Sequence, residues 1–377
     1  MGGQRTAAAG AGRHGGPDLR VGEVPNHRSG EVTEPATVSA ERVTAALRRC
    51  AALSTAQVHD VAIESVRDTI FSRITRLRLT YQSADTGAPA TLILKTGLPK
   101  WRSSRWVGGH QEVAFYRDIA EAMTRHLAPR CFEAQWNPET KDWSLLLEDL
   151  TDTHMLPTAW PLPPSHSQCE RIVDAWARFH AGWWDDSRLG TTIGAFRDAA
   201  ATDRMMQELA RHFASFADAL PKDRQNLYER LFANAARLQR RYAGRRNLTI
   251  VHGDAHVWNC FMPRHGGDDV RLFDWDAWRI GIGTTDLANM MAMHWYPDRR
   301  QRLERQLLDR YHASLLAEGV TGYDRQALEE DYRWAVVWQI TTPVWQAAYG
   351  VPPVIWWNNM EHVLLAFDDL GCRDLLI

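Results

Sequence analysis

The sequence predicts an α+β protein with a small, strand-rich N-terminal part and a larger, mostly helical C-terminal part. Three observations lead to this prediction. Short β-like segments come first, at residues 57–63, 71–81, 90–95 and 143–147. Apolar residues then recur at helical spacing in five stretches, at 168–184, 203–219, 223–244, 300–317 and 326–348. The length of 377 residues, of which 45% are hydrophobic, is sufficient for about two such parts.

The chain divides into three segments. Residues 1–36 are rich in Gly, Ala, Arg and Pro and have almost no large apolar side chains, so we expect a disordered tail. Residues 37–150 are expected to form the N-terminal part, with a short amphipathic helix at 39–53 and a longer helix at 108–126. Residues 151–377 begin with a proline-rich linker and are expected to form the helical part.

The overall composition excludes several classes of protein. The 44 basic and 46 acidic residues give a net charge of −2, so we expect neither a nucleic acid nor a membrane as partner. The five cysteines are odd in number and contain no CxxC pair, which argues against disulfide and zinc frameworks and favours a cytoplasmic setting. There is no apolar run long enough to cross a bilayer and no signal-peptide pattern. We expect a monomer or homodimer.

The most informative stretch, residues 248–276, reads as one β-hairpin. A turn centred between Gly266 and Gly267 pairs Asn259 with Asp274, and opposite side chains in a ladder lie close together. Carboxamide and carboxylate oxygens suit Mg²⁺. Asp254 precedes Asn259 by five residues, in a loop after a buried strand, where a carboxylate is placed to hold and deprotonate a substrate hydroxyl.

Lys95 and Glu112 form a second pair of candidate residues. Lys95 ends the apolar strand 91–95 and shares one face with Ile93, so its charge points into a cleft or core. Glu112 lies on the apolar stripe of the following helix. Because a buried charge is costly unless it is paired, we expect Lys95 and Glu112 to form an ion pair, which leaves other lysine donors for nucleotide phosphates.

These parts together resemble those of a kinase, and more closely those of the aminoglycoside phosphotransferase and choline kinase-like superfamily, in its ecdysteroid kinase-like branch. The resemblance covers residues 38–377 and rests on the His-Gly-Asp motif at 252–254 with the residues described above. Four further segments carry it: Glu112–Tyr116, Leu146–Leu150, Ala177–Trp184 and Asp286–Ala288. It implies a protein-kinase-like two-lobed fold, with a small antiparallel sheet in the N-lobe and a mostly helical C-lobe.

The resemblance also implies roles for the candidate residues. Asp254 would be the catalytic base, and Asn259 and Asp274 would be the Mg²⁺ ligands. Lys95 would contact the phosphates of ATP or GTP and would be held in place by Glu112.

Further residues are assigned to the nucleotide and to the acceptor. The backbone of Glu148, Asp149 and Leu150 would form the hinge between the lobes and bind adenine. His256 and Asp276 are candidate contacts of the substrate, and Asp276 has a position that would also suit a residue facing water.

The expected nucleotide loop departs from the pattern of the superfamily. Residues 65–70 connect the first two strands and contain no glycine. Backbone N–H groups or the hydroxyls of Ser65 and Thr69 would have to cover the phosphates there.

The expected function is ATP-dependent phosphoryl transfer to a hydroxyl of a small molecule, with Mg²⁺. The resemblance suggests an antibiotic or another sugar-bearing natural product as acceptor, and the 17 tryptophans favour one that contains a ring. Two alternatives stay open, a catalytically silent nucleotide-binding module and a zinc hydrolase that uses the stretch at 252–256.

Plainer roles also stay open for individual residues. His252 would orient its loop through hydrogen bonds, and the Lys95–Glu112 pair would be structural only. Asp185 and Asp186 follow a helix and either face water or line a site for a cationic substrate.

Overall fold

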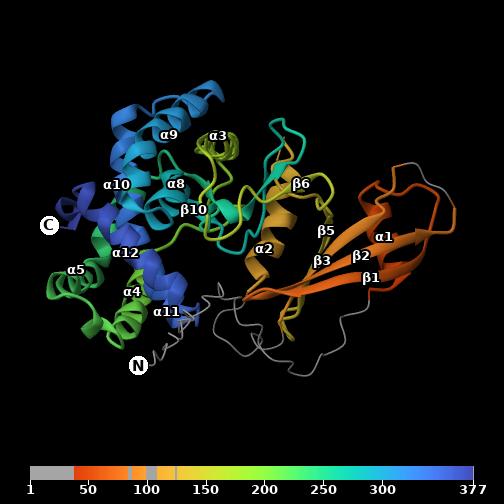
Figure 1. Cartoon of the computed structure of the whole chain (residues 1–377), viewed down its shortest axis with the longest axis horizontal. Coiled ribbons are helices and arrows are strands. Elements are labelled where there is room, and N and C mark those ends of the chain that lie inside the picture. The colour runs from red at the N-terminus through yellow and green to blue at the C-terminus, as the bar shows by residue number, and fades with distance from the viewer. Residues whose placement is uncertain (1–37, 84–86, 99–107, 124, 377) are drawn as a thin grey trace, which may run out of the picture. The chain divides into compact units, whose positions relative to one another are not determined.

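The strand-rich part of the chain is one antiparallel sheet. In the computed structural model, which describes residues 38–83, 87–98, 108–123 and 125–376, its five strands have the order β1-β2-β3-β5-β4 (Figure 1). They are β1 (Val58–Asp68), β2 (Ser72–Tyr81), β3 (Thr91–Gly97), β4 (Cys131–Trp136) and β5 (Trp143–Glu148). The predicted tail at 1–36 lies outside the described residues.

Two helices pack on this sheet. Helix α1 (Ala40–Arg49) contacts β1 and β4, and it begins where the Ser39 hydroxyl accepts a hydrogen bond from the Arg42 amide at 3.2 Å. Helix α2 (His110–Ala114) contacts β4 and β5 and continues as a π-helical turn, η2 (Phe115–Ile119), and a 3₁₀ turn, η3 (Ala120–Ala122). The predicted helix at 108–126 therefore begins two residues later and ends at Ala122.

The remainder of the chain is mainly helical, as predicted (Figure 1). Its first helices are α3 (His166–Gly182), α4 (Ala199–Phe213), η4 (Ala217–Ala219), α5 (Lys222–Ala233), α6 (Ala235–Leu238) and α7 (Arg240–Ala243). After the short 3₁₀ turn η5 (Val257–Asn259) come α8 (Thr284–Ala288), η6 (Asn289–Met293), α9 (Pro297–Ala317), α10 (Arg325–Gln339), α11 (Thr342–Ala348), α12 (Pro353–Asp369) and η7 (Cys372–Leu376).

The predicted single hairpin at 248–276 is wrong. Strand β7 (Thr249–Val251) pairs with β10 (Arg279–Gly281), whereas β8 (Cys260–Pro263) pairs with β9 (Arg271–Leu272) and with β6 (His154–Met155). The strands β7 and β10, which precede and follow the His-Gly-Asp motif in the sequence, thus form a separate two-stranded sheet.

The predicted register is also wrong, by one residue. Cys260 pairs with Leu272, so the turn is centred on Gly266 and not between the two glycines. The ladder then ends with a hydrogen bond from the Phe273 amide to the Asn259 carbonyl at 3.1 Å. Asp274 has φ 69°, in the left-handed region, and this turns the chain out of the strand direction.

An aromatic contact in the core joins two of the segments that carry candidate residues. Trp275 is fully buried and stacks on Phe115, with ring centroids 3.9 Å apart and planes 5° from parallel. Its indole N–H donates to the Leu272 carbonyl at 3.0 Å. Because Phe115 follows Glu112 by three residues and Trp275 follows Asp274 directly, this contact fixes the positions of both carboxylates.

Several elements differ from the predictions. The helix predicted at 223–244 is divided into α5, α6 and α7, and the one predicted at 326–348 is divided into α10 and α11. Strand β4 and helices α8 and α12 had no counterpart among the predictions. The described residues from Ser39 onward form one unit, so the lobe boundary near residue 150 stays a prediction.

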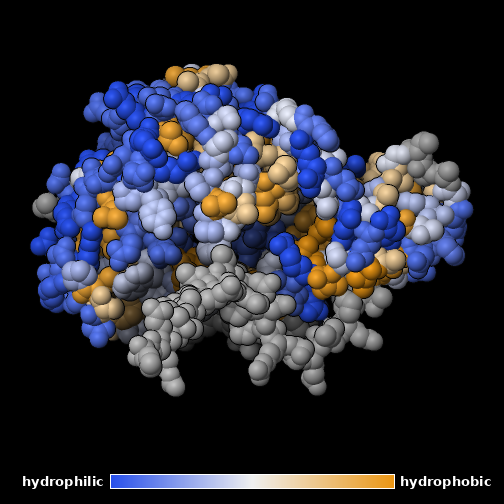
Figure 2. Space-filling model, in the orientation of Figure 1, coloured by the Kyte–Doolittle hydropathy of each residue, from blue (hydrophilic) through white to orange (hydrophobic). Residues whose placement is uncertain are grey.

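The surface combines hydrophilic residues with separate hydrophobic groups (Figure 2). The exposed large apolar side chains include Ile63 and Val66 on β1 and Val354 and Leu365 on α12. Among the described residues, every helix is too short or too polar to cross a lipid bilayer.

Replacement of Trp275 by alanine is expected to lower the free energy of unfolding by about 3–5 kcal/mol, because it removes a fully buried indole and leaves a cavity against Phe115. Urea unfolding at neutral pH measures this change. The exposed Leu162→Ala is the control and should shift stability by no more than about 0.5 kcal/mol. A similar small shift in both variants would contradict the structural importance of the stack.

Candidate active site

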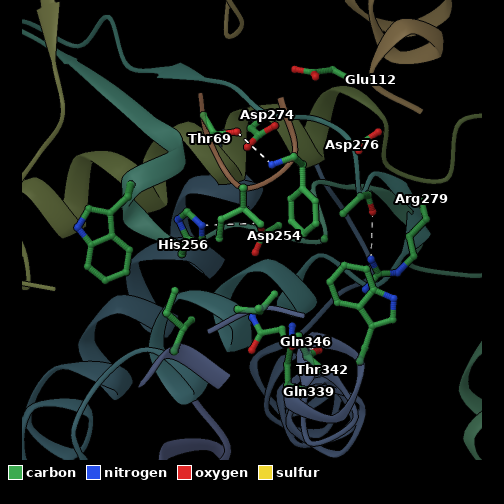
Figure 3. A pocket seen from close by; sticks show the side chains of 18 of the residues that line it. Thr69, Glu112, Asp254, His256, Asp274, Asp276, Arg279, Gln339, Thr342 and Gln346 are labelled. Carbon is green, nitrogen blue, oxygen red and sulfur yellow. Dashed lines mark hydrogen bonds and ion pairs between the residues drawn. The ribbon is translucent and has the colours of Figure 1, made fainter. Parts of the chain in front are cut away.

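A cavity of ≈ 550 Å³ lies between the turn that joins β1 to β2 and the helices α4, α10 and α11. This volume is in the range of small-molecule sites. Four groups of candidate residues line it: Lys95 with Glu112, Asp254 with His256, Asp274 with Asp276, and Thr69. Figure 3 labels all of these residues except Lys95.

Lys95 lies between two carboxylates. Its Nζ is 2.7 Å from Glu112 Oε2 and 2.6 Å from Asp274 Oδ1. The structure therefore contains the predicted ion pair with Glu112 and adds one with Asp274. Burial lowers the pKa of Lys95, but the two carboxylates outweigh it and hold that pKa above its ordinary value, so the lysine is charged.

Three carboxyl groups lie near the single ammonium group of Lys95. Glu112 is almost fully buried, and burial first and then the charges of Asp274 and Asp276 raise its pKa, against the effect of Lys95. Burial also raises the pKa of Asp276 to about 6. One ammonium thus faces three carboxyl groups, and this end of the cavity has a surplus of negative charge that a bound cation would neutralise.

Asp286 fixes the backbone of the His-Gly-Asp loop through hydrogen bonds. Its two carboxylate oxygens accept hydrogen bonds from the His252 amide at 2.7 Å and the Gly253 amide at 2.8 Å, and its Oδ2 is 3.1 Å from His180 Nε2. Burial would raise the pKa of Asp286, but the hydrogen bond and charge of His180 hold it below its ordinary value. Tyr311 lies 2.8 Å from the other nitrogen of His180 and completes the network.

His252 has a structural role, one of the alternatives left open by the sequence. Its Nε2 donates to the Phe273 carbonyl at 2.9 Å, and its Nδ1 accepts from the Asp254 amide at 3.2 Å. Burial lowers its pKa, so the ring is neutral near pH 7. The side chain ties the loop that carries Asp254 to the segment that carries Asp274.

Glycine is required at position 253. Its φ is 84°, and a Cβ atom there would lie 2.3 Å from the Ala277 carbonyl oxygen and 2.3 Å from Arg279 Nη1. Other residues would be strained by the backbone angle and would clash with the backbone of the neighbouring segment. Gly253 therefore allows the loop to adopt the conformation in which Asp254 lines the cavity.

Asp254 and His256 point into the centre of the cavity (Figure 3). The Asp254 side chain is 42% exposed, and its Oδ2 is 3.6 Å from His256 Nε2. Asn259 is buried behind it, and its amide nitrogen donates to the Asp254 carbonyl at 2.9 Å and approaches Oδ2 at 3.5 Å. The Asn259 amide oxygen is the atom left for a cation.

The donor set fits Mg²⁺ better than zinc. A carboxylate from Asp274 and an amide oxygen from Asn259 are hard oxygen ligands, which Mg²⁺ takes in small number before it completes its shell with water and phosphate oxygens. Within 38–83, 87–98, 108–123 and 125–376 the structure contains no group of three or more His, Cys, Asp or Glu residues that could hold a metal ion.

The loop predicted to cover the phosphates is shorter than expected. Ser65 lies in β1 and is exposed, so it does not line the cavity. The turn itself is formed by Thr69 to Ser72, in which the Thr69 hydroxyl accepts from the Ser72 amide at 3.0 Å. These turn residues do line the cavity. A threonine thus stabilises a tight turn without glycine.

The predicted hinge, Glu148 to Leu150, does not line this cavity. Glu148 Oε2 accepts from the Arg130 amide at 3.1 Å, Asp149 pairs with Arg76 at 2.6 Å, and the Leu150 carbonyl accepts from the His154 amide at 2.8 Å. These contacts fix the segment locally. Its contact with adenine stays a prediction.

The remaining acidic candidates have partners of their own. Asp276 lines the cavity and accepts from the Gly109 amide at 2.8 Å, which anchors the start of α2. Asp185 accepts from the Leu248 amide at 2.8 Å, and Asp186 pairs with Arg188 at 2.7 Å. Neither Asp185 nor Asp186 lines the cavity, so the structure does not place them in a site for a cationic substrate.

The sequence analysis missed three features of the site. It assigned no role to Asp286, although the segment 286–288 carried part of the resemblance. It also missed the Lys95–Asp274 contact and Arg279, which lines the cavity beside the His-Gly-Asp loop. A signal existed only for Asp286, because a carboxylate within an apolar segment needs buried donors.

Comparison with known proteins supports the predicted resemblance. Residues 189–319, about a third of the chain, match the profile of the ecdysteroid kinase-like family. The matched segment includes the His-Gly-Asp loop, Asn259, Asp274 and Asp286. No curated protein matches the sequence.

Three solved structures show the same fold. An ethanolamine kinase from Plasmodium vivax has a TM-score of 0.55 and 11% identity, over 84% of this chain and 83% of its own. A protein from Ralstonia eutropha that was proposed to be an aminoglycoside phosphotransferase has a TM-score of 0.54 and 13% identity, over 89% of this chain and 98% of its own. The choline kinase LicA from Streptococcus pneumoniae has a TM-score of 0.52 and 11% identity, over 81% of this chain and 94% of its own. The predicted kinase-like α+β fold and the resemblance to this superfamily are therefore confirmed.

Replacement of Asp286 by asparagine is expected to destabilise the protein by about 1–3 kcal/mol at pH 7, because an amide cannot satisfy both backbone donors and His180. Since the pKa of Asp286 is lowered in the folded state, its contribution is complete above the ordinary aspartate pKa and is lost as the pH falls through the folded value. The difference between wild type and variant should thus decline below about pH 4. Urea unfolding across pH measures it, and a difference that grew at low pH would contradict this account.

Proposed function

We propose that this protein transfers the γ-phosphoryl group of ATP to a hydroxyl group of a small molecule. One observation carries the proposal: Asp254, Asp274 and the Lys95–Glu112 pair line the same cavity. This is the set of groups that phosphoryl transfer requires, a cation for the phosphates, a carboxylate for a metal and a carboxylate for the acceptor hydroxyl. The solved complex of LicA with AMP, whose TM-score to this chain is 0.50, supports a nucleotide as donor.

At the nucleotide end, Lys95 binds phosphate oxygens. Glu112 holds the ammonium at the end of β3, and the exchange of one carboxylate contact for a phosphate contact keeps its charge paired. Asp274 and Asn259 would hold Mg²⁺, which supplies positive charge to the phosphate oxygens when bound. The turn at residues 69–72 also lines the cavity.

At the acceptor end, Asp254 accepts a hydrogen bond from the substrate hydroxyl and takes its proton as the new bond forms. The carboxylate is held by its own backbone, which Asp286, His252 and Asn259 fix through hydrogen bonds. Most of the rate enhancement then comes from positioning and from electrostatic stabilisation. Asp254 needs no strong basicity for this role.

We infer that the acceptor is a ring-bearing natural product, an antibiotic being one such class, because tryptophans 258, 338 and 345 line the cavity. A panel of antibiotics, sugars and amino alcohols tests this inference through ADP release with Mg²⁺ and ATP. The alternative of a silent nucleotide-binding module would give a thermal shift with Mg²⁺ and ATP but no acceptor-dependent ADP.

The Asp254→Asn variant is expected to bind Mg²⁺ and ATP almost as wild type does and to lose about 10²–10⁴-fold in kcat, because it lacks the proton acceptor but keeps the shape of the loop. Single-turnover transfer to an acceptor found in the panel measures the loss. Retention of near wild-type kcat would rule out Asp254 as the base.

The Lys95→Ala variant is expected to raise the KM for ATP by tenfold or more, since the phosphates lose a charged donor in a water-poor site. Initial-rate kinetics over ATP concentration measure the change, and the melting temperature shows whether the fold tolerates an unpaired Glu112. Lys222→Ala is the control because Lys222 is exposed on α5. An unchanged KM for ATP in a folded Lys95→Ala protein would contradict the assignment.

A further inference from the structure

Two arginines, Arg197 and Arg279, line the cavity. Arg279 lies on β10, directly beside the His-Gly-Asp loop, and its guanidinium donates to the Ala277 carbonyl at 3.2 Å (Figure 3). Arg197 precedes α4, and its Cζ atom lies 5.6 Å from the centre of the Trp338 ring. Arg197 is exposed toward the cleft and Arg279 is half-buried, so both can contact a ligand.

Neither arginine has an acidic partner among the residues that the structure describes. Arg279 contacts the Ala277 carbonyl, and Arg197 contacts the Met205 sulfur at 3.4 Å and the Trp338 ring. The pKa of Arg197 is lowered to about 10, chiefly by partial desolvation and then by the like charge of Arg279. Two guanidinium groups therefore lie within electrostatic range of each other, and neither forms a direct ion pair with a carboxylate of the described residues.

The polar groups on the adjoining wall are hydrogen-bond donors. The Gln346 amide oxygen accepts from Asn359 at 3.1 Å, which leaves its NH₂ group for a ligand. The Trp338 indole N–H has no partner among the described residues. The hydroxyls of Thr341 and Thr342 already donate to the Trp338 carbonyl and to Gln339. This wall offers donors and positive charge but no free carboxylate.

The acidic side chains that line the cavity are Glu112, Asp254, Asp274 and Asp276, and the proposed function uses three of them for the lysine, the metal and the acceptor hydroxyl. The fourth, Asp276, already accepts a hydrogen bond from the Gly109 amide. Asp185 and Asp186 do not line the cavity and have their own partners. None of these carboxylates is therefore left to bind a cationic acceptor.

Resting on the proposed function, we propose that the acceptor is an anionic, ring-bearing alcohol whose carboxylate, or another singly charged oxyanion, is bound between Arg197 and Arg279. Guanidinium groups bind carboxylates through two parallel hydrogen bonds, and the tryptophans bind the ring. This arrangement orients the molecule, because its anion is attracted to the arginines and its hydroxyl is left to contact Asp254.

Three probes of equal shape test the charge preference: para-(hydroxymethyl)benzoate, its neutral primary amide and the cationic para-(hydroxymethyl)benzylamine. Isothermal titration calorimetry gives their dissociation constants at constant ionic strength. The carboxylate is expected to bind about tenfold more tightly than either of the others. Equal affinities, a preference for the amine, or no binding of the carboxylate at millimolar concentration would overturn the proposal.

The variants Arg197→Gln and Arg279→Gln are expected to weaken carboxylate binding about tenfold each and to leave amide binding unchanged. Arg279→Lys should restore part of the loss because it keeps the charge. Arg305→Gln, at an exposed position of α9, is the matched control and should bind as wild type does. Loss of binding to all three probes at once would indicate a general structural defect and would overturn the assignment of these arginines.

The two proposals can fail separately. If the carboxylate preference holds but no probe or panel compound accepts a phosphoryl group, the proposed function fails and the anion site stands. If phosphoryl transfer occurs with neutral or cationic acceptors and the arginine variants have wild-type kinetics, the anion site fails and the proposed function stands. The Asp254→Asn variant is expected to keep the carboxylate preference in either case.

Discussion

The ammonium group of Lys95 connects three segments that are far apart in the sequence. It belongs to β3, and its two partners belong to α2 and to the segment after β9. Burial of this charge costs several kcal/mol unless it is well paired, so the sheet, the helix and the loop are positioned relative to one another by the need to satisfy it. The buried stacking contact between Phe115 and Trp275 stabilises the same arrangement of these segments.

Two groups of like charges line the cavity. Glu112, Asp274 and Asp276 lie near Lys95, and Arg197 and Arg279, which line the same cavity, have no carboxylate partner among the described residues. Like charges repel within each group, which is unfavourable in the empty protein, and a ligand of opposite charge reduces this repulsion. A cation near the carboxylates and an anion near the guanidinium groups would each have this effect.

The features that follow from local pattern were predictable. Alternation in β3 and helical spacing in α2 placed Lys95 and Glu112 on buried faces, and the cost of burial then required their pairing. The contact with Asp274 and the role of Asp286 depend on segments more than thirty residues away, which no local pattern specifies. The hairpin register was wrong because adjacent glycines, 266 and 267, offer two turn centres, and α12 was missed because it begins at a proline and is apolar on most sides.

The hydrogen bond from the Gly109 amide to Asp276 has a consequence for how ligands influence one another. Asp274 and Asp276 are separated by one residue, yet the first binds Lys95 and the second binds the start of α2. A ligand that shifts this segment also shifts β3 and α2, and the same segment leads directly into Arg279. If the proposed donor and acceptor both bind, this shared segment would link them thermodynamically, and the factor by which each changes the affinity for the other would be the same.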